Sequence, residues 1–355
     1  MKKETPKITI VFPSFARVPW GGAKIAFLHA NLLCEAGAEV TICFDCSGSL
    51  QKYGLPDIVR RAICTACVFY YPRWFPLDRK IKKKCIFKIS DDQVPDADHV
   101  VATAVETAEQ VHWLSKKKGK KHYLIQDFEN WKMGSEDVRR TYRFGMSNIV
   151  VSKWLEEIVG KEAGEPPVLI SNPIDEGVFY PIEGIRRSDT IAVLYHEAKH
   201  KGFDVLYSAI NLVKDEYPSL RVLAFGSPDR PDYFPEWIEY KQNATQEDLR
   251  QIYSASQIYA CATRNEGFGL TLAESMYCGC ALVSTSFPGV YEYADSSCAV
   301  LLDEGGPGAL ARAIVGLLEN PERAREIARK GREYALSKCS MAKVKQLLID
   351  EFELG

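Results

Sequence analysis

The sequence predicts an α/β fold with two domains, because strand-like apolar runs alternate with helical patterns in two successive series. The chain has 355 residues, which is long for one α/β domain and comfortable for two. Residues 8–12 form the kind of continuous apolar run that a parallel sheet buries on both faces. Apolar residues at helical spacing follow as far as Gly37, and residues 40–44 form the next strand, which completes a βαβ unit.

The alternation continues along the whole chain. Further strands of the first series are expected at residues 99–104, 123–126 and 148–152. The segment 164–167, Gly-Glu-Pro-Pro, is a suitable start for a connection between domains. Strands of the second series are expected at residues 190–195, 220–225, 257–262 and 281–285, and the chain is helical almost throughout from residue 321. This order favours two similar halves with a cleft between them.

Composition and charge limit the classes of partner. Hydrophobic residues make up 46% and charged residues 26% of the chain, as in an ordinary globular protein. The net charge is -2, yet residues 1–165 hold 26 Lys and Arg against 20 acids, whereas the remainder holds 19 against 27. The two halves therefore indicate different partners. Because the chain as a whole is not basic, nucleic acid is not an expected partner.

The cysteines and the first residues indicate a cellular compartment. No apolar stretch near the start is typical of a signal peptide, and none is long enough to span a bilayer, so we expect a cytoplasmic protein. Its eleven cysteines are then reduced thiols. Cys43 with Cys46 and Cys64 with Cys67 have a zinc-ribbon spacing, which leaves structural zinc as an alternative. Since Cys43 lies in a strand-like run, we favour buried reduced cysteines.

The sharpest feature is the segment 265–274, Asn-Glu-Gly-Phe-Gly-Leu-Thr-Leu-Ala-Glu, where a strand gives way to a helix. Its two glycines let the backbone come close to a ligand, because no Cβ atom stands in the way. The helix that begins there offers free N–H groups and the positive end of its dipole to a phosphate. Glu266 and Glu274 are suited to accept hydrogen bonds from sugar hydroxyls. The alternative is a glycine-rich turn with two solvated glutamates.

This segment resembles the signature of two glutamates separated by seven residues in retaining GT-B glycosyltransferases, in particular glycosyltransferase family four. The resemblance implies a GT-B fold, with Rossmann-like domains at 1–168 and 169–335 that face each other across a cleft. It also implies a C-terminal helix, 336–355, that packs back on the first domain. In that family the residue at Glu266 contacts the transferred sugar and the one at Glu274 the ribose. Donor phosphate would meet the backbone at Gly267, Phe268, Gly269 and Leu270.

Other positions of the second half match the family residue by residue. Lys201 opens a helix, where a lysine opposes the dipole unless an anion is bound, and relatives have a diphosphate-binding lysine there. His196 stands where relatives usually carry an arginine, although neutral histidine donates one hydrogen bond and lacks the guanidinium fork. Gly226 and Asn243 lie at strand ends, where a nucleotide would meet the carboxyl edge of the sheet.

The first half carries weaker matches. Gly21 and Gly22 resemble the glycine loop that faces the donor phosphates in the family, and a plain flexible turn is the alternative. Asp127 follows a strand where relatives often have an acidic residue near the transferred sugar, so it is our acceptor-side candidate. Asp96 and Asp98 suggest the metal-binding Asp-x-Asp of another glycosyltransferase fold. We interpret them as a solvated turn, and expect no metal and no cofactor beyond the donor.

Two basic clusters lie in the first half, at residues 79–84 and 116–121. A solvated face is the simpler interpretation. The functional alternative is attraction to anionic lipid headgroups, with interfacial anchoring by nearby aromatic residues. Those aromatic residues are Tyr70, Tyr71, Trp74 and Phe75.

The resemblance implies a retaining, metal-independent glycosyltransferase in which Lys201 and the turn stabilise the leaving phosphate. Glu266 would position the sugar rather than act as a nucleophile. The donor would be a nucleotide sugar. The acceptor would be a hydroxyl of a glycan or a lipid-linked glycan, in bacterial surface polysaccharide or glycoconjugate assembly. Three alternatives stay open: a nucleotide-sugar epimerase of the same fold, a non-catalytic carbohydrate-binding relative, and a zinc-ribbon protein.

Overall fold

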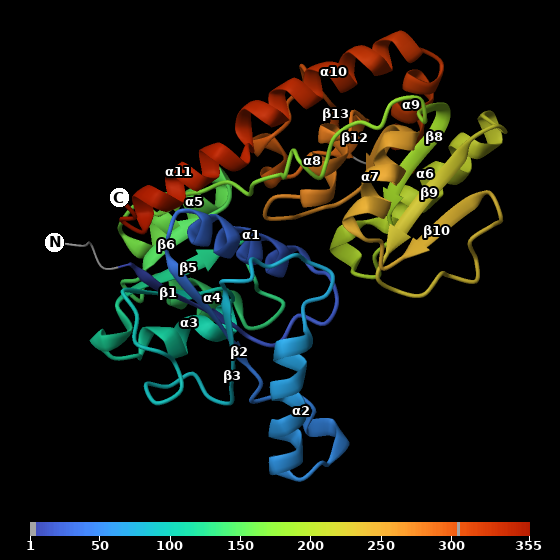
Figure 1. Cartoon of the computed structure of the whole chain (residues 1–355). Coiled ribbons are helices and arrows are strands. Elements are labelled where there is room, and N and C mark those ends of the chain that lie inside the picture. Colours follow the sequence, from blue (N-terminus) through green and yellow to red (C-terminus); the bar gives the residue numbers. More distant parts are fainter. Residues whose placement is uncertain (1–4, 304–305) are drawn as a thin grey trace. The chain divides into compact units, whose positions relative to one another are not determined.

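The computed structural model describes residues 5–303 and 306–355, which form two compact units. Unit 1 comprises residues 1–171 and 342–355, and unit 2 comprises residues 172–341. Each unit is a parallel sheet with helices packed on it, so the α/β architecture that the sequence predicts is confirmed (Figure 1). The helix expected at 336–355 is two helices, because α10 ends at Lys338 in unit 2 and α11 begins at Met341.

Unit 1 contains a seven-stranded sheet in the order β3-β2-β1-β4-β5-β6-β7. Its strands are β1 (Lys7–Phe12), β2 (Glu39–Asp45), β3 (Lys82–Ile86), β4 (His99–Ala102), β5 (Lys120–Ile125), β6 (Ser147–Val150) and β7 (Val168–Leu169). Its helices are α1 (Gly21–Glu35), α2 (Asp57–Tyr70), α3 (Val105–His112), α4 (Ser135–Tyr142), α5 (Lys153–Ala163) and α11 (Met341–Glu351). All neighbouring strands are parallel.

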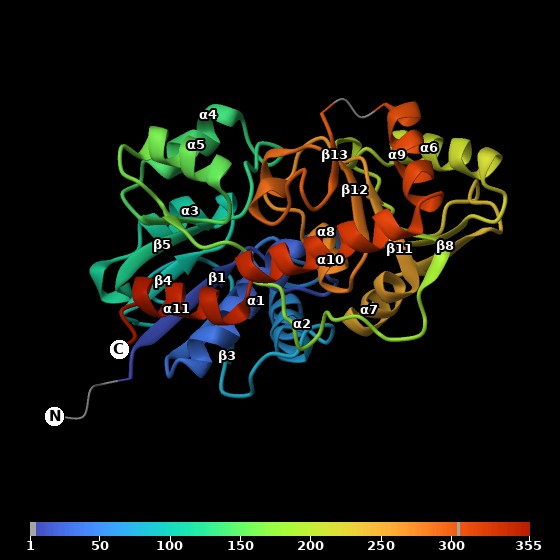
Figure 2. The same cartoon turned by 90° about the horizontal axis from the view of Figure 1, so that it is seen from above.

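The last helix completes the core of unit 1. α1 and α11 cover the same face of the sheet, because Leu33 of α1 and Leu348 of α11 line one apolar cavity with residues of four strands. Figure 2 shows α3 on the opposite side of β4 and β5 from α11. Glu351 of α11 accepts a hydrogen bond from Ser147 at 2.6 Å. Its Oε1 also lies 3.0 Å from Nδ1 of the buried His122.

Unit 2 contains a six-stranded parallel sheet in the order β10-β9-β8-β11-β12-β13. Its strands are β8 (Arg187–Leu194), β9 (Arg221–Gly226), β10 (Ile238–Gln242), β11 (Ser256–Cys261), β12 (Ala281–Thr285) and β13 (Val300–Leu302). Its helices are α6 (Phe203–Glu216), α7 (Gln246–Ala255), α8 (Leu270–Tyr277), α9 (Pro307–Leu318) and α10 (Pro321–Lys338). Apolar residues of α6 and α9 pack on the strands and form its main core.

The order of strands in unit 2 places a switch point between β8 and β11. From β8 the chain builds outward through β9 and β10, and it then returns to the other side of β8 with β11. Open parallel sheets bind ligands outside the carboxyl ends of the strands at such a point. The segments that follow β8 and β11 are therefore where a ligand is expected.

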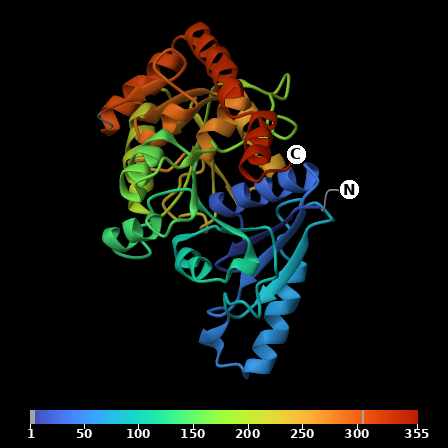
Figure 3. The ribbon, with the colours of Figure 1, turned by 90° about the vertical axis from the view of Figure 1, so that its left-hand side faces the viewer.

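Two segments of unit 1 differ from what the sequence predicts. Residues 82–84, expected as part of a solvated basic cluster, form the edge strand β3 instead, and lysines are typical of edge strands. Figure 3 shows α2, in light blue, beside this edge. The segment 164–167, expected to connect the domains, joins α5 to β7 inside unit 1. Among the described residues, no helix has the length and apolar character needed to cross a bilayer.

Candidate functional site

The turn between β11 and α8 has a backbone that only glycine can adopt. Gly269 has a φ of 86° and directly precedes Leu270, the first residue of α8. A Cβ atom at Gly269 would lie 2.7 Å from Tyr293 Oη and 2.8 Å from Cζ of Phe287. The hydroxyl of Tyr293 also donates a hydrogen bond to the carbonyl oxygen of Gly269 at 3.1 Å. Tyr293 and Phe287 thus hold the turn in place. The first N–H groups of α8 have no acceptor inside the helix.

The first part of the same turn rests on a second glycine. Gly289, in the short helix η4 (Pro288–Glu292), approaches so closely that a Cβ atom there would lie 2.6 Å from the carbonyl oxygen of Gly267. Phe268 is only 3% exposed, and its ring centroid lies 5.0 Å from that of Tyr293. Phe268 therefore anchors the turn in the core, and its backbone, not its ring, belongs to the candidate site.

Lys201 and Glu266 form an ion pair at the switch point. Nζ of Lys201 lies 2.9 Å from Oε1 of Glu266. Both side chains are largely buried, with 23% and 13% of their surface exposed. Lys201 ends the short helix η3 (Lys199–Lys201), which follows β8, whereas Glu266 follows β11. The two residues come from segments 65 positions apart in the sequence, and the strand order brings them together.

A close backbone contact explains why these two segments meet. Gly202 has a φ of 63° and precedes α6, and a Cβ atom there would lie 2.0 Å from the carbonyl oxygen of Ala262. The backbone N–H of Arg264 donates to the carbonyl oxygen of His200 at 2.7 Å. The turn after β8 is therefore packed directly on the turn after β11 and hydrogen bonded to it.

His196 lies in the same turn and is exposed to solvent. Its Nδ1 accepts the backbone N–H of Ala198 at 2.9 Å, so a neutral ring carries its proton on Nε2. Partial burial lowers the pKa of His196, and the nearby charges of Lys201 and His200 lower it further. At neutral pH the ring thus offers one neutral N–H donor, as the sequence predicts for histidine at this position.

Glu274 lies within α8 and is almost completely buried, with 2% of its surface exposed. The alternative of two solvated glutamates is therefore wrong for Glu274. The side chain shares its surroundings with Tyr253, whose pKa is raised by burial and by the Glu274 carboxylate. The hydroxyl of Tyr253 is buried without a hydrogen-bond partner.

Gly226 and Asn243 are adjacent at the carboxyl ends of β9 and β10. The N–H of Asn243 donates to the carbonyl oxygen of Gly226 at 2.8 Å. A Cβ atom at Gly226 would lie 2.4 Å from the carbonyl oxygen of Tyr195, so the chain after β8 crosses directly over this glycine. Asn243 has a φ of 49°, which few residues other than glycine and asparagine adopt. Both residues thus border the same edge of the sheet as His196.

The three remaining candidates, Gly21, Gly22 and Asp127, belong to unit 1. Gly21 and Gly22 open α1 after β1, and Gln126 Nε2 donates to the carbonyl oxygen of Gly22 at 3.0 Å. Asp127 Oδ1 accepts the N–H of Phe128 at 2.8 Å. The glycine pair and the acidic residue after β5 are therefore neighbours. They lie at the carboxyl ends of the strands, near the point between β1 and β4 where the strand order of the unit 1 sheet reverses.

Glu129, which the sequence did not single out, lies two residues beyond Asp127. Its Oε2 accepts the N–H of Val105, the first residue of α3, at 2.6 Å. Burial raises the pKa of Glu129 to about 7, and the charges of Glu106 and Asp127 act in the same direction. No local pattern marks this residue, because its partner lies 24 positions earlier in the chain.

The residues proposed as alternatives for metal binding have other partners. Asp96 accepts a hydrogen bond from Lys118 at 2.6 Å, and Asp98 accepts one from the backbone N–H of Lys7 at 2.7 Å. All eleven cysteines are free thiols, and nine of them are buried, as expected for small core residues. Within residues 5–303 and 306–355, no cluster of three or more His, Cys, Asp or Glu side chains is arranged to hold a metal ion.

Comparison with known proteins gives a family match within the second unit. A family model described as "Glycosyl transferases group 1" matches residues 181–334. The chain is 30% identical over 149 residues to a D-inositol 3-phosphate glycosyltransferase of Segniliparus rotundus, which covers 38% of this chain and 33% of that protein. It is 25% identical over 215 residues to an alpha-maltose-1-phosphate synthase of Mycolicibacterium smegmatis, which covers 51% and 55%. The matches thus span a third to about half of the length of these relatives.

The fold is similar to that of solved structures over nearly the whole chain. Anabaena HepE, solved in complex with UDP and glucose, superposes with a TM-score of 0.74 at 14% identity, over 98% of this chain and 99% of HepE. Similarity at that level of identity concerns the fold, which is GT-B. Residues 181–334 of this chain therefore match the group 1 glycosyltransferase family model, and the chain as a whole has a GT-B fold of two Rossmann-like domains.

Proposed function

We propose that this protein is a retaining glycosyltransferase that moves a sugar from a nucleotide-sugar donor to an acceptor hydroxyl without a metal ion. The observation that carries the proposal is the Lys201–Glu266 pair, 2.9 Å apart at the switch point of the unit 2 sheet and beside the N-terminus of α8. A buried cation, a carboxylate and free helix N–H groups at one sheet edge match the two parts of such a donor, its diphosphate and its sugar.

The diphosphate binds to the cationic side of this pair. Lys201 contributes a point charge, and the N–H groups at Leu270 and Thr271 contribute hydrogen bonds along the dipole of α8. These donors are fixed before the reaction, so they stabilise the negative charge that grows on the leaving phosphate. The Nε2–H of His196 adds one donor in place of the more usual arginine. This arrangement supplies the charge that a metal ion provides in other glycosyltransferases.

The sugar binds to the acidic side. In the ligand-free protein Glu266 is paired with Lys201, and a bound diphosphate competes for that lysine. The carboxylate is then available to accept hydrogen bonds from the hydroxyls of the transferred sugar. We assign Glu266 to positioning of the sugar, and not to nucleophilic attack. Glu274 remains our candidate for the ribose hydroxyls, from its buried position in α8.

Unit 1 supplies the acceptor side in this proposal. Gly21 and Gly22 face the donor phosphates, and Asp127 lies near the acceptor hydroxyl. The acceptor is a glycan or a lipid-linked glycan, in the assembly of a bacterial surface polysaccharide or glycoconjugate by a cytoplasmic protein at the inner face of the membrane. Because the similar HepE structure contains UDP and glucose, UDP-sugars are the first donors to test.

The test uses donor binding and turnover together. Thermal unfolding with UDP-, GDP- and ADP-sugars identifies the donor, since a ligand at 100 times its dissociation constant stabilises a protein by about 2.7 kcal/mol. Glu266→Gln should then lower kcat by about 100-fold or more, as loss of a transition-state contact does. Glu239→Gln is the matched control. Glu239 pairs with Arg221 near the amino ends of β9 and β10, at the opposite end of the strands from the candidate site.

Three results would contradict the proposal. One is the absence of a thermal shift with every nucleotide sugar. Another is unchanged turnover in Glu266→Gln. The third is conversion of the donor to an isomeric sugar nucleotide without added acceptor, which would identify an epimerase instead.

A further inference from the structure

Helix α2 of unit 1 turns its apolar side toward solvent. Of the large hydrophobic residues exposed in the described chain, seven lie within 18 consecutive positions that include this helix. Ile58 is 80% exposed and Phe69 is 63% exposed. The exposed set is Tyr53, Leu55, Ile58, Val59, Ile63, Phe69 and Tyr70. At 100° per residue, those in α2 occupy one continuous sector of the helix together with Ala62 and Ala66, which are also exposed.

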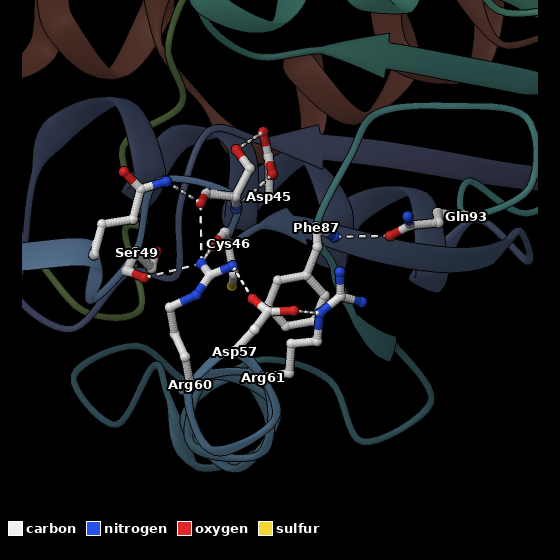
Figure 4. A network of polar contacts seen from close by, with 10 residues as sticks. Asp45, Cys46, Ser49, Asp57, Arg60, Arg61, Phe87 and Gln93 are labelled. Carbon is white, nitrogen blue, oxygen red and sulfur yellow. Dashed lines mark hydrogen bonds and ion pairs between the residues drawn. The ribbon is translucent and has the colours of Figure 1, made fainter. Parts of the chain in front are cut away.

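The polar side of α2 is instead held against the protein, as Figure 4 shows. Nη1 of Arg60 donates to the carbonyl oxygens of Cys46, Ser47 and Ser49 at 3.0–3.3 Å. Asp57, in the first turn of the helix, accepts hydrogen bonds from both Arg60 and Arg61 at 2.7 Å. The position of the helix is thus fixed by charged and polar contacts.

Few apolar side chains of α2 are buried against the rest of the protein. Only Cys64 and Val68 of the helix are buried. The guanidinium of Arg61, whose side chain is half exposed, lies 4.7 Å from the ring centroid of Phe87. An amphipathic helix of a soluble protein normally buries its apolar stripe. A contiguous exposed apolar face of this kind marks a surface that binds another apolar phase.

Positive charge lies at both ends of this face. Residues 51–88 contain ten Lys and Arg and two acids, and one of those acids, Asp57, is already paired with two arginines. At one end of the face, Nζ of Lys52 lies 5.1 Å from the ring centroid of Tyr53. At the other end, the guanidinium of Arg73 lies 4.9 Å from the ring centroid of Tyr70. An aromatic ring with a cation beside it is suited to the boundary between lipid tails and headgroups.

We propose that the exposed face of α2 docks on an anionic lipid surface, with the helix lying in the plane of the headgroups. An apolar helix face with cations beside it is the arrangement by which helices bind such surfaces. Each Lys or Arg near an anionic leaflet adds about 1 kcal/mol, which is about a fivefold gain in affinity. The docking needs no sugar donor, so it goes beyond the proposed transfer reaction and is testable without it.

The structure changes which residues are assigned to this surface. The sequence suggested that Trp74 and Phe75 anchor in the interface, yet Phe75 is buried and Trp74 Nε1 donates to the carbonyl oxygen of Ala16 at 3.1 Å. Lys118, in the second basic cluster, is also buried and is bound to Asp96. The lipid-facing residues are therefore those of α2 and the cations close to it in sequence.

The test is sedimentation of the full chain with vesicles of phosphatidylcholine, with and without phosphatidylglycerol. The wild-type protein should bind the anionic vesicles at least tenfold more tightly, and added salt should weaken the binding because it screens the cations. The double variant Ile58→Ser, Phe69→Ser should lose at least tenfold in affinity. The matched control is Leu212→Ser, Tyr233→Ser, two residues that are also exposed but lie in unit 2. It should bind like the wild type.

Charge is tested separately with Lys52→Gln combined with Arg73→Gln, the cations at the two ends of the face, which should lower the affinity by about 25-fold. Equal binding of the wild type to both kinds of vesicle, or equal loss in the control variant, would overturn the proposal. So would a dimer in sedimentation velocity that the Ile58 and Phe69 changes dissociate in a protein that does not bind vesicles, because the occupant would then be a second copy. Donor-induced thermal shifts should be the same in all variants, which separates this proposal from the transfer reaction.

Discussion

Gly202 touches the carbonyl oxygen of Ala262 so closely that no side chain fits between them. A Cβ atom at Gly202 would lie 2.0 Å from that oxygen, which is backbone and has no freedom to turn away. This contact sets the distance between the turns that follow β8 and β11, and so it sets the distance between Lys201 and Glu266. The geometry of the candidate site thus depends on a residue that has no chemistry of its own.

Gly202→Ala should therefore damage both stability and donor binding. Alanine with a φ of 63° is strained by about 1–2 kcal/mol, and the contact with Ala262 adds to that, so we expect a loss of at least about 3 kcal/mol. Urea unfolding measures the loss. Gly184→Ala is the control, because Gly184 has a φ of 78° but open space around it. This variant should lose stability only through the backbone strain. Equal losses of stability in the two variants would show that the contact with Ala262 does not contribute to the effect.

His29 should make the protein less stable in acid. Burial lowers its pKa to about 4, and its Nε2 is buried without a partner. Below pH 6.5 the unfolded chain therefore binds a proton that the folded protein does not, so stability falls as the pH falls toward 4. His29→Leu should remove about 2 kcal/mol of this loss at pH 5. The check is urea unfolding of both proteins at pH 7.5 and pH 5, and parallel pH profiles would contradict the prediction.

Glu129 should have the opposite pH dependence. Burial raises its pKa to about 7, so the folded protein keeps a proton that the unfolded chain has lost above pH 4.5. Stability therefore falls as the pH rises from 4.5 to about 7. Glu129→Gln keeps an acceptor for the N–H of Val105 without a charge, and should be more stable at pH 8 by up to about 3 kcal/mol. A variant that is less stable than the wild type at pH 8 would refute this.

The central strands of both sheets could be predicted because each contains a mostly apolar run. Residues 281–285 were expected as a strand and form β12 with those bounds, and the run at 8–12 is β1 less its first residue. The edge strand β3 was missed, because Lys82, Lys83 and Lys84 give it the composition of a solvated loop. Edge strands pair on one side only, so their hydrophobic signal is weak.

The parts of the site that local sequence encodes were also predictable. Glu266, Gly267 and Gly269 lie in one turn, and the two glycines there signal a close approach of backbone. The support of that turn was not predictable, because Tyr293 reaches Gly269 across 24 positions and Gly289 reaches Gly267 across 22. The proximity of Glu274 to Tyr253, which lies in another helix, could not be predicted for the same reason. Contacts between residues far apart in the sequence decide these features, and the periodicity of the sequence does not reveal such contacts.

The place of α11 has a consequence for the order in which the protein is made. Phe352, just after this helix, stacks on His122 at 4.6 Å, and Leu348 is buried in the same core. Residues 342–355 leave the ribosome only after all of unit 2 has been synthesised. Domains usually fold in the order of their synthesis. We therefore expect the first domain to complete its core only after the second domain has been synthesised, when residues 342–355 become available.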